Sequence, residues 1–399
     1  MRITALLVAL SFGGIVTAQT NGTVDGSAQS YRHRGDEALE QGDFTAAIRN
    51  YSLSLESDRS DDVELQKKIA TLHQWIREYG AAKELLGSVI ARNPDDAEAV
   101  TTLQQLQIRR GLQMTGNVGE EEVDYTTRTY SAGAAYGGVD WLDLHAGFSQ
   151  SSKLVYDRSD LWLEAYVFPS YRTYIRFGLR QKNYSYPSST TAVPDNNAYA
   201  RVPDFQLEFG HYYFKENHFS IEGEYFTPNF YWNNGLRANN YKIGGTIRNW
   251  IVRPVYAEVF AAVLHDPDPG SLIMDPATGS IAGFGYENMT LLGGAVGFES
   301  DRLSVDLKYV PDRDLDRSLN WSLFSRIRVN MNAFSMQYDF LYDTYPASTT
   351  NAFSSSQVHM LTGAVEPAAF LEMRVGVKML LRDVTRVAPF ISLRLKTGV

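Results

Sequence analysis

A period of two residues constrains the fold of this chain more than any other feature of its sequence. It recurs in runs of about ten residues along 120–399, the length that a membrane-spanning strand needs. It is clearest in 161–180, where apolar side chains occupy every second position. Successive side chains of a strand point to opposite faces, so each run forms a strand with one apolar and one polar face. A soluble sandwich buries the apolar face, whereas a transmembrane barrel turns it towards lipid.

The connections between these runs favour the barrel. Short turns, as at Pro169-Ser170, alternate with long polar loops, as at 183–202 and 265–282. In outer-membrane barrels the short turns lie in the periplasm and the long loops lie outside the cell. We therefore predict an all-β transmembrane antiparallel barrel of about 14–16 strands over 120–399, preceded by a small all-α domain. A soluble double sandwich is the alternative.

The first residues are typical of an exported protein. Arg2 precedes an apolar run, and small residues lead up to Ala18, so we interpret 1–18 as a signal peptide rather than a short buried helix. The chain contains no cysteine, which excludes disulfides and thiolate metal sites. No later segment holds 18 continuous apolar residues, so we predict no transmembrane helix. A net charge of −9 argues against a nucleic-acid partner.

Residues 30–110 have a helical period instead. Phe44 and Tyr79 are 35 residues apart, as are Ala47 and Ala82, and tetratricopeptide repeats recur every ~34 residues. Small residues at such positions let the two helices of a repeat approach each other. The pattern predicts a tetratricopeptide-repeat-like helical domain over 30–110, and the glycines of 111–119 favour a linker to the barrel.

Two repeats are fewer than a stable array usually holds, so this domain is expected to lean on the barrel or on a partner. We predict that residues 30–110 lie in the periplasm and dock a periplasmic protein. Four charged residues suit the recognition of an extended peptide or glycan: Glu37, Asp43, Arg77 and Lys83. The alternative is a helical hairpin that acts only as a spacer.

One short segment carries a family resemblance. Phe168-Pro169, followed by Arg172-Thr173-Tyr174, is similar to the aromatic-Pro turn and Arg/Thr-Tyr strand of the YaiO-type outer-membrane β-barrel family. Some members of that family carry tetratricopeptide repeats before the barrel. More distantly, repeats followed by a barrel resemble exporters of exopolysaccharide such as cellulose. The resemblance implies a barrel in the outer membrane, in contact with its lipid, and a channel or exporter component for a polysaccharide or other small polar solute.

The polar faces of the predicted strands collect charges of both signs. Neighbouring opposite charges form ion pairs that brace a lumen, and charged rings also select the solutes that pass through it. Both roles stay open for this set. The candidate lumen and selectivity residues are Glu164, Arg172, Arg176, Arg180, Glu208, Glu222, Glu224, Arg326, Arg328, Arg374 and Lys378.

The sequence carries little sign of catalysis. Its seven histidines are scattered, and it contains neither an H-E-x-x-H nor a G-x-S-x-G motif. Neighbouring strands supply only His211 and Ser220 as a candidate pair. We therefore predict no catalytic residue, no metal site and no cofactor. A scaffold that assembles partners is the alternative to a channel, and an enzyme that modifies lipid or glycan is a third.

Overall fold

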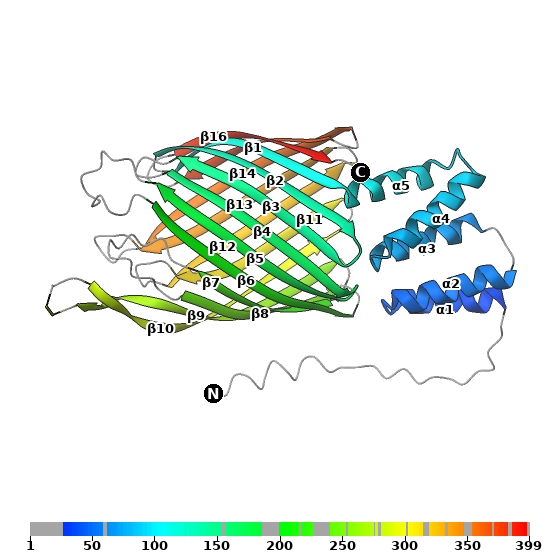
Figure 1. Cartoon of the computed structure of the whole chain (residues 1–399), viewed down its shortest axis with the longest axis horizontal. Helices are drawn as coiled ribbons and strands as arrows, with labels where there is room; N and C mark the ends of the chain where they lie inside the picture. The colour runs from blue at the N-terminus through cyan, green and yellow to red at the C-terminus, as the bar shows by residue number, and fades with distance from the viewer. Residues whose placement is uncertain are drawn as a thin grey trace.

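The computed structural model describes residues 27–58, 62–123, 125–152, 157–185, 199–214, 217–226, 240–252, 254–274, 276–277, 281–300, 302–313, 319–331, 334–346, 353–368, 371–381 and 385–396. The predicted signal peptide lies outside these residues. Helices come first in the chain, and strands follow (Figure 1). The helices are α1 (Ala28–Glu40), α2 (Phe44–Asp58), α3 (Val63–Trp75), α4 (Tyr79–Arg92) and α5 (Ala97–Arg110).

The strands form one closed antiparallel barrel in which every strand pairs with its sequence neighbours and β1 pairs with β16. This confirms the predicted fold, with 16 strands. The strands are β1 (Leu112–Val123), β2 (Tyr125–Val139), β3 (Leu142–Ser152), β4 (Asp157–Ser170), β5 (Thr173–Ser185), β6 (Tyr199–Phe214), β7 (Asn217–Phe226), β8 (Asn240–Val252), β9 (Val255–Met274), β10 (Ile281–Glu299), β11 (Leu303–Arg313), β12 (Leu319–Met331), β13 (Phe334–Pro346), β14 (Phe353–Ala368), β15 (Leu371–Leu381) and β16 (Thr385–Lys396).

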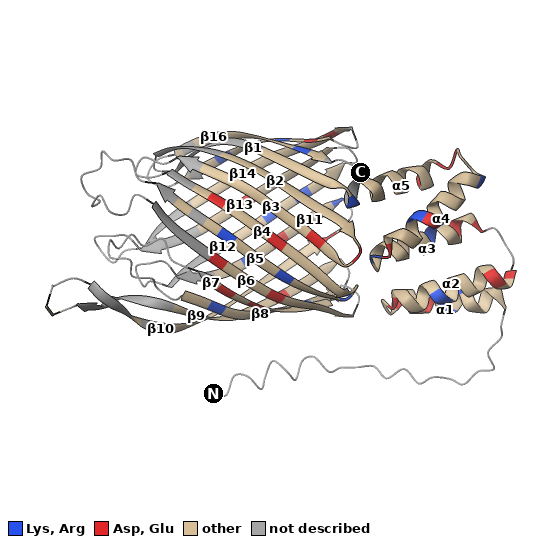
Figure 2. Ribbon diagram, viewed as in Figure 1, with Lys and Arg blue, Asp and Glu red and all other residues tan. Residues whose placement is uncertain are grey.

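The apolar positions of the strands lie on the outside of the barrel. Leu207 is 52% exposed and Val375 is 54% exposed, whereas Asp204 and Asp339 are buried. A soluble sandwich would bury the apolar side chains and expose the carboxylates. The period of two therefore separates an apolar exterior from a polar lumen, as in barrels that span lipid. Figure 2 marks the charged residues along the strands.

The two ends of the barrel differ in the length of their connections. At the end that faces the helices, consecutive strands are joined by two or three residues. At the opposite end, neighbouring strand ends are farther apart in the sequence, most of all between Ser185 and Tyr199 and between Phe226 and Asn240. Two predicted connections were wrong in position. The turn after β4 is Tyr171-Arg172, and β9 and β10 extend through most of the predicted loop 265–282.

Irregular strand pairing explains both differences. The β4–β5 register shifts between Val167 and Ser170, which places Pro169 at a bulge, where its missing N–H breaks no regular ladder bond. The β9–β10 register shifts twice, between Ile281 and Gly283 and between Phe284 and Gly285. A strict period of two does not anticipate such shifts, so the sequence pattern ended these strands too early.

The barrel also begins earlier than predicted. Residues 111–119 were expected to form a linker, but β1 starts at Leu112, one residue after the C-cap of α5 at Gly111. The β1 segment pairs with β16 from Gln113 to Gly119 and with β2 along its whole length. Without β1, both β2 and β16 would expose unpaired edges, so the glycine-containing segment is the strand that closes the barrel.

The helices, called here the helical module, form two hairpins, α1–α2 and α3–α4, followed by α5. Ala47 and Ala82, the equivalent positions of the predicted repeats, are both fully buried. Tyr51 is also fully buried, and its ring lies against Gly35, where a Cβ atom would approach within 2.4 Å. None of the described helices is long and apolar enough to cross a membrane.

Candidate functional site

Most of the predicted lumen residues lie on the inward face of their strands. Their positions alternate with exposed apolar residues such as Leu163, Phe177 and Val375. The inward set comprises Glu164 on β4, Arg176 and Arg180 on β5, Glu208 on β6, Glu222 and Glu224 on β7, Arg326 and Arg328 on β12, and Arg374 and Lys378 on β15.

Arg172 is the exception, and its prediction as a lumen residue was wrong. It lies in the turn between β4 and β5, because that turn comes two residues later than the sequence pattern suggests. Its Nη2 atom donates a hydrogen bond to the Gly42 carbonyl of the helical module (2.8 Å), and its Nε atom donates to the Tyr171 hydroxyl (3.0 Å). Arg172 therefore joins the barrel to the helices.

Ion pairs between neighbouring strands brace the lumen wall. Arg176 Nε lies 3.0 Å from Glu208 Oε2, and the Tyr174 hydroxyl donates to the other oxygen of the same carboxylate (2.6 Å). On the opposite side of the ring, Arg326 Nε donates to Asp339 Oδ1 (2.6 Å). Opposite charges on adjacent strands stabilise each other in this arrangement. The structure thus contains the ion pairs expected of a braced lumen, which is one of the two roles predicted for these residues.

Other predicted residues take part in similar contacts. Lys242 Nζ lies 2.9 Å from Glu222 Oε1, and Gln206 donates to Glu224 (3.0 Å). Arg374 forms an ion pair with Glu372, a buried carboxylate that also lies 3.7 Å from Arg394. Arg328 donates through Nε to Asn330 (3.1 Å) near the short-turn end of β12. Paired polar and charged side chains therefore occur on several strands along the lumen wall.

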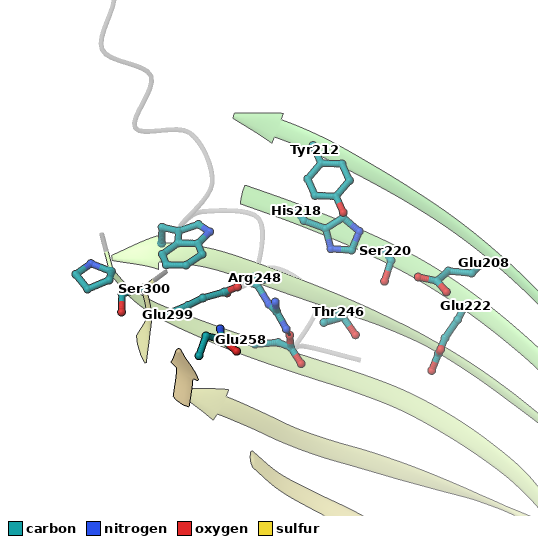
Figure 3. A pocket seen from close by; sticks show the side chains of 13 residues that line it. Glu208, Tyr212, His218, Ser220, Glu222, Thr246, Arg248, Glu258, Glu299 and Ser300 are labelled. Carbon is teal, nitrogen blue, oxygen red and sulfur yellow. Dashed lines mark hydrogen bonds and ion pairs between the residues drawn. The ribbon is translucent and has the colours of Figure 1, made fainter. Parts of the chain in front are cut away.

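A cavity of about 960 Å³ lies inside the lumen near the short-turn end. Its lining comes mainly from β6–β9 and includes Pro254 and Ser300 from two short turns (Figure 3). Arg248 donates through Nε and Nη2 to one oxygen of Glu258 (2.9 and 2.7 Å), and Lys308 lies 3.5 Å from the other oxygen. The lining is polar and contains more carboxylates than cationic groups: Glu208, Glu222, Glu258 and Glu299 against Arg248.

Aromatic side chains cover part of the same wall. The His218 ring stacks on Tyr174 (5.8 Å between centroids) and contacts Tyr212 (4.8 Å). Tyr174 in turn lies over Gly210, where a Cβ atom would come within 2.2 Å of the ring. A side chain at Gly210 would therefore push Tyr174 away from the wall.

The sequence pattern did not single out His218, although it alternates in step with Glu222 and Glu224 on β7. Because His218 lies an even number of residues from these two inward glutamates, its side chain also points into the lumen. The candidate pair His211 and Ser220 is not brought together: His211 contacts Phe219 on the outer face, whereas Ser220 lines the cavity. Within the described residues, no group of three or more His, Asp or Glu side chains is arranged to hold a metal ion.

A second set of contacts joins the helical module to the short-turn rim. Arg77 donates through Nε to the Asp140 carbonyl (2.7 Å) and through Nη2 to the Asp143 carboxylate (2.7 Å). Its guanidinium lies 3.6 Å from the centroid of the Phe168 ring. Arg110 donates to the Gly138 carbonyl (2.5 Å). The module therefore contacts the β2–β3 and β4–β5 turns, and Arg77 faces the barrel rather than a partner groove.

No known family model matches this chain, and neither does any curated protein. Among solved structures, a bacterial polysaccharide outer-membrane secretin is 11% identical, with 72% of this chain and 97% of that chain covered (TM-score 0.43). Wzi of Escherichia coli, described as a carbohydrate-binding β-barrel involved in capsule assembly, is 9% identical, with coverages of 85% and 99% (TM-score 0.43). OprB of Pseudomonas putida is 9% identical, with coverages of 73% and 95% (TM-score 0.41). The resemblance to the YaiO-type family and the tetratricopeptide repeats stay predictions.

Proposed function

We propose that this protein is an outer-membrane channel for a polar solute, with its helical module in the periplasm. The observation that carries the proposal is the closed barrel with an apolar exterior and a charged lumen that contains a cavity of about 960 Å³. Closed barrels are the only sheet structures that satisfy every backbone group inside lipid. Barrels of 16–18 strands are also wide enough to leave an aqueous path between their walls.

The lengths of the connections support this orientation. Short turns face the periplasm in outer-membrane barrels, and the helical module contacts the short-turn rim through Arg77, Arg110 and Arg172. The opposite end of the barrel, where β5 ends at Ser185 and β7 ends at Phe226, then faces the outside of the cell. In the proposed orientation, the module lies where a solute would enter from, or leave to, the periplasm.

The lumen favours a hydrophilic solute such as a polysaccharide or a smaller polar molecule. Its inward side chains are charged or polar on most strands, and ion pairs such as Arg176–Glu208 hold long side chains along the wall. Tyr212 is 37% exposed and lines the cavity, so its ring is available to contact a sugar face. Ring faces contribute apolar contact while the surrounding carboxylates accept hydrogen bonds from hydroxyl groups.

Single-channel recording tests this proposal. The purified full chain, checked by heat-modifiable migration in detergent gels, is added to a planar bilayer. We expect stepwise increases in conductance as single barrels insert. Heat-denatured protein is the control and should give no steps. Folded protein that inserts into liposomes but never conducts would overturn the channel proposal.

A second role is proposed for the helical module, because its contacts with the barrel involve only part of its surface. Glu37 and Lys83 lie on exposed positions of α1 and α4, away from the contacts made by Arg77 and Arg110. Such a surface is suited to docking a periplasmic protein, as the sequence predicts. This role is compatible with a channel and also with a scaffold.

A further inference from the structure

The seam between β10 and β11 is the shortest in the described part of the barrel wall. The two strands pair over six residues each, from Gly294 to Glu299 on β10 and from Ser304 to Tyr309 on β11. Every other pair of neighbouring strands is joined over at least seven described residues, and β9 and β10 are joined over 17. The ladder between strands therefore holds the wall together least at this seam.

Both strands continue beyond the point where their pairing stops. Within the residues described for β11, Val310–Arg313 have partners on β12 but none on β10. Likewise, the described residues of β10 from Ile281 to Gly293 pair with β9 alone. Figure 1 shows the β9–β10 hairpin projecting past its neighbours at the end away from the helices. Each strand therefore turns an unpaired edge towards the other along this part of the wall.

The unpaired part of the seam begins among outward apolar residues. Leu292, on the outer face of β10, is 62% exposed, whereas Val263 on the neighbouring strand β9 is 44% exposed. Val296 and Tyr309 lie on the same outer face beside the paired part of the seam. The greater exposure of Leu292 agrees with the lack of a β11 neighbour. The seam thus ends its pairing where the outer surface of the barrel is still apolar.

Inside the barrel, the character of the side chains changes at the same level. Glu258 on β9 and Lys308 on β11 lie 3.5 Å apart and belong to the polar lumen. The inward residues that follow them are apolar and are called here the apolar patch: Phe260, Ala262 and Leu264 on β9, Met289 and Leu291 on β10, and Val310 on β11. Apolar side chains on the inward face are the reverse of the pattern in the rest of the described wall.

Phe260 lies where the polar lumen meets the apolar patch. Its ring covers Gly293, where a Cβ atom would come within 2.2 Å of the ring and within 2.7 Å of the Tyr309 carbonyl oxygen. The Lys308 ammonium group lies 5.6 Å from the centroid of the same ring. The aromatic ring therefore reaches across β10 towards β11, at the last residues that the two strands pair.

We infer that the barrel opens sideways between β10 and β11 and admits the hydrocarbon chain of a membrane lipid to the lumen. The inference rests on the proposed outer-membrane channel and adds an amphiphile to its ligands. The hydrocarbon chain lies against the apolar patch, because contact with apolar side chains removes it from water. The polar head group lies beside Glu258 and Lys308, next to the cavity. A wholly polar solute would leave the patch without a partner, so patch and seam together favour an amphiphile.

Fluorescence quenching by brominated lipid tests the inference. The chain contains no cysteine, so a single introduced cysteine carries a bimane fluorophore at one known site. Val310→Cys and Leu291→Cys place the probe inside the lumen at the seam. In liposomes whose acyl chains carry bromine, we expect both probes to be quenched severalfold more than Thr362→Cys. Thr362 also points inwards, but its strand is paired on both sides at this position, with Gln337 and Gly376.

An outward probe gives the reference for full contact with lipid. Leu292→Cys should be strongly quenched, and the two seam probes should approach its value. Heat-modifiable migration confirms that each labelled variant has folded, and Val310→Cys decides alone if the buried Leu291 does not tolerate the label. Seam probes quenched as weakly as Thr362→Cys overturn the inference, while conductance steps still support a channel. Weak quenching of Leu292→Cys in inserted protein would mean that this surface does not face lipid, and the outer-membrane proposal itself would fail.

Discussion

Arg77 is one of three arginines that connect the helical module to the barrel, with Arg110 and Arg172. It follows α3 with a φ of 68°, a left-handed conformation that costs a non-glycine residue about 1–2 kcal/mol. Glycine would adopt this conformation without strain. The arginine instead aims its guanidinium at the Asp140 carbonyl, the Asp143 carboxylate and the Phe168 ring. The backbone strain is therefore offset by contacts that only a long cationic side chain provides.

This balance leads to a prediction about Arg77→Gly. The change relieves the backbone strain but removes every contact between this side chain and the barrel, so the helical module should detach more easily from the rim. We expect faster cleavage of the module by added protease, while the barrel keeps its heat-modifiable migration. Lys83→Ala, an exposed change on α4, is the control and should leave cleavage unchanged. Equal protection of Arg77→Gly and wild type would show that Arg110 and Arg172 suffice as anchors.

The same residue scale shows where sequence reasoning fails. The period of two correctly placed Arg176, Glu208 and Arg326 on an inward face, because successive side chains of a regular strand point to opposite faces. It misplaced Arg172, since alternation does not reveal where a strand stops. The bulge around Pro169 delays the turn and moves Arg172 out of the wall. Arg77 was expected to bind a partner, because nothing in its sequence context indicates the barrel turns that it contacts.

At the scale of elements, α3 and α5 each begin with a carboxylate cap. Asp62 accepts a hydrogen bond from the Leu65 N–H (2.9 Å), and Asp96 accepts one from the Ala99 N–H (2.9 Å). These backbone donors lower the pKa of both carboxyls, as a negative charge at a helix N-terminus is stabilised. Hydrogen bonds from Lys68 and Tyr51 likewise lower the pKa of Asp36, between α1 and its neighbours.

We therefore predict that acid destabilises the helical module before the barrel. A carboxyl with a lowered pKa in the folded state contributes stability that is present above its unfolded value, about 3.9, and is lost as the pH falls through the folded value. The helical far-ultraviolet signal of the full chain should melt at a lower temperature at pH 3 than at pH 7. Asp62→Asn keeps the cap but cannot titrate, so it should reduce this pH dependence. An identical shift in Asp62→Asn and wild type would exclude this cap as a source.

Each strand also has a lipid face that can be tested at a single pair of neighbours. Leu207 points outwards on β6, and Gln206, one residue before it, points inwards and contacts Glu224. An arginine at position 207 should impair insertion, at about 2–4 kcal/mol if it lies near mid-membrane. Gln206→Arg is the matched control, because it places the same charge beside a carboxylate. The yield of heat-modifiable protein in liposomes measures both, and equal yields would contradict the lipid-facing surface.

At the scale of the whole molecule, the sequence predicts the class of fold but not the arrangement of charge around it. Strands such as β7 and β15 are more than one hundred residues apart in the chain, and only barrel closure sets Glu222 across from Arg374. The sequence did not predict the strand that closes the barrel. The glycines of 111–119 resemble a linker, and nothing near them in the sequence indicates that they pair with β16. Which inward side chains lie opposite each other is consequently a property of the ring and of no single strand.

Deleting the helical module tests how the molecule works as a whole. Barrel closure begins at Leu112, so a chain that lacks residues 27–110 but keeps the preceding residues should still form a heat-modifiable barrel. The module lies against the short-turn end (Figure 1), so we expect its removal to widen that entrance and to raise the single-channel conductance. The milder Arg77→Gly variant should shift conductance in the same direction by a smaller amount. Unchanged conductance, together with the loss of a co-purified periplasmic protein, would instead mean that the module stands beside the entrance and acts only in docking. The truncated chain still contains every strand that the closed sheet requires. If it nevertheless fails to insert, the module is needed for assembly of the barrel.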